Sequence, residues 1–430
     1  MQRSTNRKRI LSVSGAIVAA TAIVVGLGGC SAGGGSDQGG PTDNLEVFSY
    51  WTSGSESDAL NALIDDFKAK NPGVKVTNAA VAGGGGSNAQ AALQARLAGG
   101  NPPDTWQAAP LNGVSQYSDA GLLEDLTSLY KKENWSKVIP QDVIDATAVD
   151  GKMYGAVTNV HRSNALWYNE KALADAGVDP ASLKSFEDVI ALNDTFASKD
   201  ISTLCVGGNG GYGPRVLFEN VLFAALGVDD WKQLFAGKIS WDDPKVKAAV
   251  QTFVGSIAVW NKDSESLAWN DAIQRLGQGS CAFSAMGDWA YGELMNQGFT
   301  YEDDFGYVEF PGSADTFLAN ADLFVVSNKA KNQINAQNWI KTANSAEAQV
   351  DFSKYKGSVP VRSDADVSTL TSYQQETAKL FQSEERSYSF QQGAMAPSAY
   401  VLAFSDALVQ LTNDHDVKTF IATMKSAATE

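Results

Sequence analysis

The sequence predicts an α/β protein made of two doubly wound lobes. Short apolar strands alternate with amphipathic helices along most of the chain, which is the β-α-β pattern of such folds. About 385 residues follow the N-terminal leader and linker, more than one typical core holds and enough for two lobes. The hydrophobic content of 44% is ordinary for a globular protein.

The first element is a leader with the composition of a lipoprotein signal. Four basic residues precede an apolar stretch over residues 10–27, and "LGGC" then ends at Cys30. An ordinary secretory peptide with a chance cysteine is the alternative, but "LGGC" fits the lipobox pattern closely. We therefore expect residues 1–29 to be removed and Cys30 to be lipidated, with its acyl chains holding the protein on the outer face of the cell membrane.

Residues 30–44 are rich in glycine and serine and have no large apolar side chain, so we expect a flexible tether. Loss of the leader removes four basic and no acidic residues, which changes the formal charge from −16 to −20. Such an acidic body repels nucleic acid and anionic headgroups. We therefore expect no nucleic-acid partner and membrane contact through the lipid anchor alone, since no other apolar stretch of about twenty residues is present.

The folded part is expected to begin near Leu45 with the strand "LEVFSYW". Apolar residues at 60, 63, 64 and 67 then recur at helical spacing, and "NPGVKVTNAAV" returns to a strand after an Asn-Pro-Gly turn. The same alternation continues over residues 152–159, 165–178, 185–199, 305–310 and 322–343.

The glycine run "GGGGSNAQ" (83–90) opens a predicted helix. A phosphate loop would need a lysine after the last glycine, and none follows, so nucleotide binding is not expected. Two interpretations stay open. Backbone amides near Ser87 could face an uncharged ligand in a cleft, or the run could be a tight turn.

Cys205 and Cys281 are the two cysteines that remain after Cys30. In an oxidising compartment such a pair most often forms a disulfide, although two buried thiols would give the same sequence.

Motifs for catalysis are missing. The sequence has no "GxSxG" or "HExxH", and its two histidines are His161 and His415. We therefore expect no catalytic residue, metal or cofactor. Acidic residues are plentiful, and a glycosidase needs only two suitably spaced carboxylates, so a secreted glycoside-processing enzyme remains an alternative.

Ten tryptophans indicate a different chemistry. A pyranose ring has an apolar face and a rim of hydroxyls, so sugar sites combine an aromatic wall with carboxylates, amides or a lysine. Core packing remains the more frequent role for any single tryptophan.

Several motifs together resemble one family. They are "LEVFSYWTSGSESDALNALIDDFKAKNPGVKV", "AGGGGSNAQAALQARLAGGNPPDTWQ", "NVHRSNALWYN", "DDWKQLF", "AWNDAIQRLGQGSCAFSAMGDWAYG", "KGSVPVR" and "QGAMAP". In this order they are similar to the glucose- or mannose-type extracellular solute-binding proteins of bacterial ATP-binding-cassette sugar importers. The resemblance covers essentially the whole mature chain.

This resemblance implies a type II periplasmic-binding-protein-like fold with a hinge and a neutral sugar enclosed between the lobes. The first lobe would comprise residues 45–159 and about 316–357, and the second 160–315 and about 358–430. It also implies a monomer that delivers a mono- or disaccharide to a membrane-embedded permease. A binding protein for another polar solute, such as a polyol, is the remaining alternative.

The resemblance also implies which side chains contact the sugar. The aromatic walls would come from three tryptophans, and the polar contacts from carboxylates, amides, an imidazole and a lysine. The expected ligand-binding residues are Trp51, Glu56, Gln107, His161, Trp269, Trp289, Asp322, Lys356 and Gln392. Family members with a closed monosaccharide pocket resemble this chain except for histidines where Ala109 and Gln392 stand. We therefore expect extra space at Ala109, sufficient for a disaccharide or for a different monosaccharide with bridging water.

Overall fold

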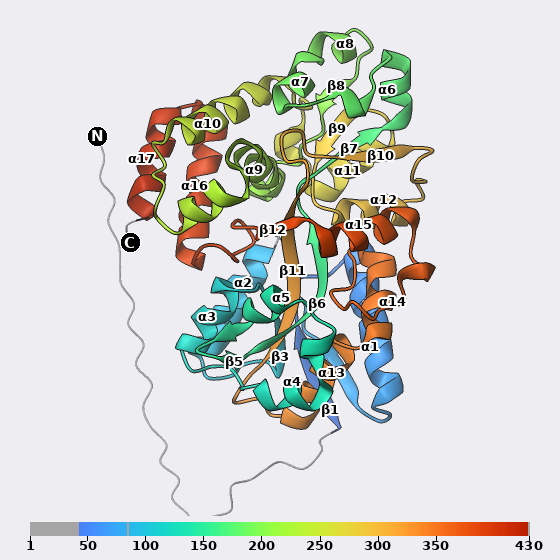
Figure 1. Cartoon of the computed structure of the whole chain (residues 1–430), viewed down its shortest axis with the longest axis vertical. Coiled ribbons are helices and arrows are strands. Elements are labelled where there is room, and N and C mark those ends of the chain that lie inside the picture. Colours follow the sequence, from blue (N-terminus) through green and yellow to red (C-terminus); the bar gives the residue numbers. More distant parts are fainter. Residues whose placement is uncertain (1–42, 84–85, 429–430) are drawn as a thin grey trace, which may run out of the picture. The chain divides into compact units, whose positions relative to one another are not determined.

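The computed structural model describes residues 43–83 and 86–428 of the 430-residue chain (Figure 1). The predicted signal peptide, Cys30 and most of the predicted tether lie outside the described residues. Within the described part, no helix is long and apolar enough to cross a membrane. The first strand begins at Asn44, one residue before the predicted start.

A six-stranded mixed sheet forms one half of the fold. The strand β1 pairs in parallel with β2 and with β3, and β11 pairs with β3 in the antiparallel direction. The strand β11 also pairs with β12 and, on a second path, with β6. The spatial order is β12 (Glu385–Tyr388), β11 (Thr316–Val326), β3 (Thr105–Ala108), β1 (Asn44–Phe48) and β2 (Lys75–Asn78), with β6 (Gly155–Arg162) beside β11.

Helices cover both sides of this sheet (Figure 1). The predicted apolar face of α1 (Gly54–Lys70) is buried, including Leu60, Leu63 and Phe67. This helix lies with α13 and α14 on one side, while α2 and α3 lie on the other. The remaining bounds are α2 (Ser87–Ala98), α3 (Asn112–Asp119), α4 (Thr127–Glu133), α5 (Gln141–Asp145), β4 (Ala148–Val149), β5 (Lys152–Met153), α13 (Gln333–Ala343) and α14 (Ala346–Lys356).

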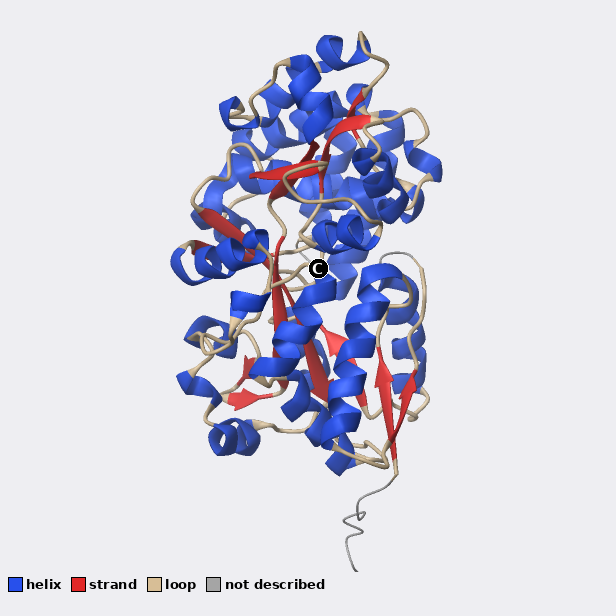
Figure 2. Cartoon of the chain, turned by 90° about the vertical axis from the view of Figure 1, so that its right-hand side faces the viewer, coloured by secondary structure: helices blue, strands red, loops and turns tan. Residues whose placement is uncertain are grey.

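A four-stranded mixed sheet forms the other half, again with flanking helices (Figure 2). Its order is β10 (Phe305–Glu309), β7 (Ala165–Asn169), β9 (Cys281–Ala285) and β8 (Ser202–Leu204). The helices are α6 (Glu170–Ala176), α7 (Phe186–Ala191), α8 (Asn193–Ala197), α9 (Tyr212–Phe235), α10 (Pro244–Ser256), α11 (Trp269–Gly277), α12 (Trp289–Asn296), α15 (Ser372–Ser383), α16 (Ser398–Asp414) and α17 (Val417–Ala427). Each half has its own apolar core.

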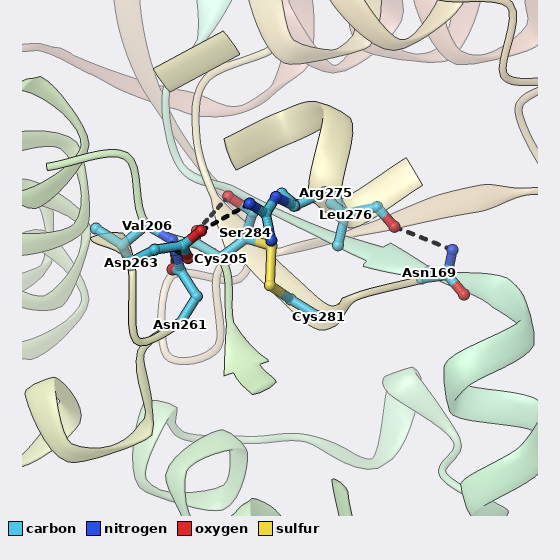
Figure 3. Close-up of a disulfide and its surroundings, with 9 residues drawn as sticks. All are labelled: Asn169, Cys205, Val206, Asn261, Asp263, Arg275, Leu276, Cys281 and Ser284. Carbon is cyan, nitrogen blue, oxygen red and sulfur yellow. Dashed lines mark hydrogen bonds and ion pairs between the residues drawn. A yellow bond between two sulfur atoms is a disulfide. The ribbon is translucent and has the colours of Figure 1, made fainter. Parts of the chain in front are cut away.

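The predicted disulfide is present in this second half (Figure 3). Cys205 follows β8 directly, and Cys281 opens β9, which pairs with β8 in parallel. The two Cα atoms are 5.5 Å apart, within the range that a disulfide requires. Two hydrogen bonds fix the backbone next to the disulfide. Ser284 Oγ donates to the Cys205 carbonyl, and the Val206 amide donates to Asn261 Oδ1.

Two residues connect β6 to β7 and so carry the chain from one sheet to the other. Of these, the buried Asn164 also holds the second crossing, from β10 to β11. Its Nδ2 donates to Ser313 Oγ at 3.0 Å and to the Thr316 carbonyl at 2.9 Å. Its Oδ1 accepts from the Leu318 amide at 2.9 Å. One side chain therefore ties both crossings together.

Candidate functional site

A cavity of about 340 Å³ lies among segments that are far apart in the sequence. Tyr50 and Gln107 enter it from the ends of β1 and β3, and Asp322 enters it from β11. The helices α2, α3, α9 and α16 and the loop 391–393 complete its wall. A volume of this size is typical of sites for small polar ligands. The cavity is therefore the candidate binding site.

Asp322 is the carboxylate of this cavity. Its Oδ1 accepts from Gln107 Nε2 at 2.8 Å, and its Oδ2 lies 3.4 Å from His161 Nε2. Burial alone would raise the pKa of Asp322, but the adjacent His161 and the charge of Lys356 outweigh burial and lower it. The group is therefore held as an anion, which is the form that accepts hydrogen bonds from hydroxyls.

His161 links this carboxylate to the second half of the fold. Its Nδ1 contacts Asp288 Oδ1, and the edge of its ring packs on Trp289, with ring centroids 5.3 Å apart. Burial would lower the pKa of His161, but the charge of Asp288 reverses this effect and raises it. His161 and Trp289 are both buried outside the cavity wall. His161 therefore contacts Asp322 directly, and Trp289 packs on His161.

Glu56 and Lys356 form a second charged pair. The Lys356 Nζ lies 2.5 Å from Glu56 Oε1 and 5.3 Å from the centroid of the Trp51 ring. Trp51 itself is buried against Phe324 and Phe352. The structure therefore brings Trp51, Glu56 and Lys356 into one cluster beside the cavity.

The last two predicted residues lie on the second half. Gln392 lines the cavity and donates from Nε2 to Tyr212 Oη at 2.8 Å. Trp269 is half-buried at the start of α11 and does not line the cavity. Of the nine predicted ligand-binding residues, Gln107, Asp322 and Gln392 line the cavity directly. Ala109, where extra space was expected, lines it as well.

Several buried polar atoms of the cavity residues have no hydrogen-bond partner among the described residues. Among them are the acceptor Gln107 Oε1 and the donor Gln391 Nε2, whereas Asp322 Oδ2 has His161 Nε2 at 3.4 Å. A buried polar atom without a partner costs about 1–3 kcal/mol, so such atoms are usually matched by a ligand or water. Their mixture of donors and acceptors suits a polyhydroxylated molecule.

Comparison with known proteins places this fold and cavity in a family. The family described as bacterial extracellular solute-binding protein matches residues 62–380. The chain belongs to this family of solute-binding proteins. An ABC transporter extracellular-binding protein of Pyrococcus horikoshii is 31% identical over 96% of this chain and 94% of its own. A probable sugar-binding periplasmic protein of Mesorhizobium japonicum is 31% identical over 90% of this chain and 92% of its own.

Solved structures agree on the fold of this solute-binding protein. A chitin oligosaccharide binding protein has a TM-score of 0.79 and is 18% identical, over 90% of this chain and 98% of its own. At that identity the likeness shows the two-lobed type II fold alone. Among the described residues, no group of three or more His, Cys, Asp or Glu side chains is arranged to hold a metal ion.

The last glycine of the run 83–86, Gly86, lies at the start of α2 and lines the cavity. Its backbone is in the left-handed conformation, with φ of 97°. A Cβ atom there would lie 3.2 Å from the Tyr50 ring. Gly84 and Gly85 lie outside the described residues. The N-cap of α2 is Gly86, and Ser87 is the first residue of the helix.

Sequence reasoning missed part of the cavity wall. It did not find Tyr50, Arg215 or Gln391, nor the glutamines of α2. One signal was available, because Gln90 and Gln94 are four residues apart and therefore share one helical face. No comparable signal marks Arg215, which lies among the apolar residues of α9.

Proposed function

We propose that this solute-binding protein is a sugar receptor that captures its ligand in the cavity beside Asp322 and delivers it to the permease of an ABC importer. The carrying observation is that the carboxylate of Asp322 and the side-chain amides of Gln107, Gln391 and Gln392 line one cavity although they come from distant segments. Sugar hydroxyls both donate and accept, so one ligand can form hydrogen bonds with a carboxylate and with amides. The names of related proteins, including a xylose/arabinose-binding protein of Haloferax volcanii, support a sugar as the ligand.

The charged clusters have a role in this proposal. The anionic Asp322 would accept from sugar hydroxyls, while His161 and Lys356 keep it charged. Glu56 and Lys356 would border the sugar, while the buried Trp51 and Trp289 would hold Lys356 and His161 in place. The side-chain amides of Gln107 and Gln392 would form hydrogen bonds with hydroxyls of the sugar. Trp269 would reach the ligand only at the edge of the site. No step of bond breaking is required of any of these residues.

We also propose that the lobes divide as the resemblance implies, with crossings near residues 159–160 and 315–316 and at about 357–358. The two crossings tied by Asn164 would form the hinge. The protein would act as a monomer, anchored to the outer face of the cell membrane through lipidated Cys30. Changing Cys30 to Ala should release the protein from the membrane fraction.

A thermal-shift screen over mono- and disaccharides, with polyols for comparison, tests the proposed function. A ligand present at 100 times its dissociation constant stabilises the protein by about 2.7 kcal/mol. Small-angle scattering with the ligand found should then show compaction, because contacts from the second lobe form only on closure. If no sugar stabilises the protein and a polyol does, the proposal is wrong.

A further inference from the structure

Arg215 places a positive charge in the wall of the cavity that Asp322 also lines. The residue lies on α9 and lines the cavity together with Ser405 of α16. Its Nη1 donates to Ser405 Oγ at 3.0 Å, and its Cζ lies 5.6 Å from the centroid of the Tyr212 ring. Its Nε is buried and has no hydrogen-bond partner among the described residues.

No carboxylate of a described residue forms an ion pair with this guanidinium. Glu219 lies one turn further along α9, but its carboxylate is turned to another segment. It accepts from Ser389 Oγ and from the amides of Phe390 and Gln391, at 2.8 to 3.1 Å. Burial raises the pKa of Glu219 to about 7, so it compensates Arg215 poorly. Burial also lowers the pKa of the Arg215 guanidinium, and the opposing influence of Tyr212 and Glu219 does not reverse this shift.

The negative charge of the cavity belongs to Asp322, which has partners of its own. Asp322 is held by Gln107 and lies close to His161 and Lys356. The cavity wall therefore contains a carboxylate whose charge is already paired and, among the described residues, a guanidinium without an ion-pair partner. A withdrawn cation without a partner is costly, and an anion placed against it makes charge-assisted hydrogen bonds.

We infer that the ligand is a sugar acid, a saccharide that carries one carboxylate, and that Arg215 binds this carboxylate. This inference rests on the proposed sugar-receptor function and specifies its substrate class, in place of the neutral sugar expected from the sequence. A single guanidinium offers parallel N–H donors to one carboxylate and neutralises one charge. A dianionic phosphate would need a second cation, and Arg215 is the one Lys or Arg among the described residues that line the cavity.

The acidic surface of the protein does not oppose this interaction at close range. Charges separated by more than about 8 Å are largely screened at physiological ionic strength, whereas a carboxylate at Arg215 would be in direct contact. The surface charge would slow association of an anion, and the direct contact would slow its release.

The test measures calorimetric affinities of the mature protein for matched pairs of probes. These are glucose and glucuronate, galactose and galacturonate, and cellobiose and cellobiuronate. Within each pair that binds, we expect the acid to bind at least tenfold more tightly than its neutral partner. Arg215→Gln should abolish this preference while changing the affinity for neutral sugars less than threefold, and Arg215→Lys should retain part of it.

Two further measurements separate binding from structure. Lys238→Gln removes the same charge from an exposed position of the second half and should keep the preference. Without ligand, Arg215→Gln should melt at the same temperature as the parent or higher, because it removes a charge that burial disfavours.

If neutral sugars bind and acids bind no better, the inference is overturned and the sugar-receptor function stands. The same conclusion follows if the preference survives in Arg215→Gln. If neither class binds in any pair, both the inference and the proposed function fail.

Discussion

Arg162, at the crossing between the two sheets, and Arg215, in the wall of the cavity, are both largely withdrawn from solvent, but their charges are treated differently. Arg162 donates to Glu309 and Glu384 and to the Thr316 carbonyl, and its Cζ lies 4.4 Å from the Phe317 ring centroid. Among the described residues, Arg215 has one hydrogen bond, to the neutral hydroxyl of Ser405.

The pKa directions record the same contrast. Burial would lower the pKa of Arg162, but the acidic groups around it, Tyr307 and Glu384 among them, raise it. The pKa of Arg215 is lowered, since burial is not offset there. A buried charge with partners serves the fold, because removing it strands those partners. A buried charge without partners adds little to the fold and is available to a ligand.

The largest expected effect lies at the crossing. Arg162→Ala should lower the free energy of unfolding by about 3–5 kcal/mol, because it leaves the carboxylates of Glu309 and Glu384 unpaired. Urea unfolding followed by circular dichroism measures this change. Arg275→Ala is the matched control, since its ion pair with Asp263 is 43% and 38% exposed and should contribute about 0–1 kcal/mol. A loss below 1 kcal/mol for Arg162→Ala would erase the contrast with Arg215.

The next effect concerns binding rather than stability. Asp322→Asn replaces one carboxylate oxygen by a donor, and the ligand's hydroxyls then lose a charge-assisted acceptor. We expect the affinity for the ligand found by screening to fall by about 1.5–3 kcal/mol. Calorimetry measures it, with Asp303→Asn on an exposed turn as the control. Unchanged affinity in a folded Asp322→Asn variant would move the site away from this carboxylate.

The elements around these residues were predictable to different degrees. The buried face of α1 and the alternation of strands and helices follow from periodicity, which is a local property of the chain. The pairing of β11 with β3, β6 and β12 was not predictable, because strand neighbours are set by contacts between distant segments. In particular, β12 has four residues and no clear alternation, and it joins the six-stranded sheet although residues 358–430 were assigned to the second lobe.

The site shows the same division. The resemblance identified Asp322, Gln107 and Gln392, which line the cavity, because their motifs are short and ordered along the chain. Arg215 escaped notice because nothing in the sequence of α9 shows that its neighbours lack a carboxylate. The absence of a partner is a property of the packed molecule, so it becomes visible only when α9 and α16 are placed together.

Substitution of Trp269 tests whether the binding site extends beyond the cavity wall. This side chain is half-buried and lies outside the cavity wall, at the start of α11. If the ligand or lobe closure brings a sugar face against it, Trp269→Ala should weaken binding by about 1 kcal/mol through lost aromatic contact. Affinities of Trp269→Ala and of the parent, measured by calorimetry, decide this. Equal affinities would confine the site to the cavity wall.

The last prediction tests why Glu219 does not pair with Arg215. Burial raises the pKa of Glu219 to about 7 against an ordinary value of 4.5, so the folded state holds this proton more tightly than the unfolded state. The resulting stability is fully present below pH 4.5 and is lost as the pH rises through about 7. The slope is at most about 1.4 kcal/mol per pH unit.

In Glu219→Gln the side chain stays neutral, so the difference in unfolding free energy between variant and parent should change between pH 4.5 and about pH 7, the window set by the two pKa values. Taking the difference cancels His161, which titrates in both proteins. Glu133→Gln, at an exposed position, should give a flat difference over the same range. A flat difference for Glu219→Gln would mean that this carboxylate is ionised throughout. It could then offset the charge of Arg215 from one turn away, and the two arginines would differ less than their contacts indicate.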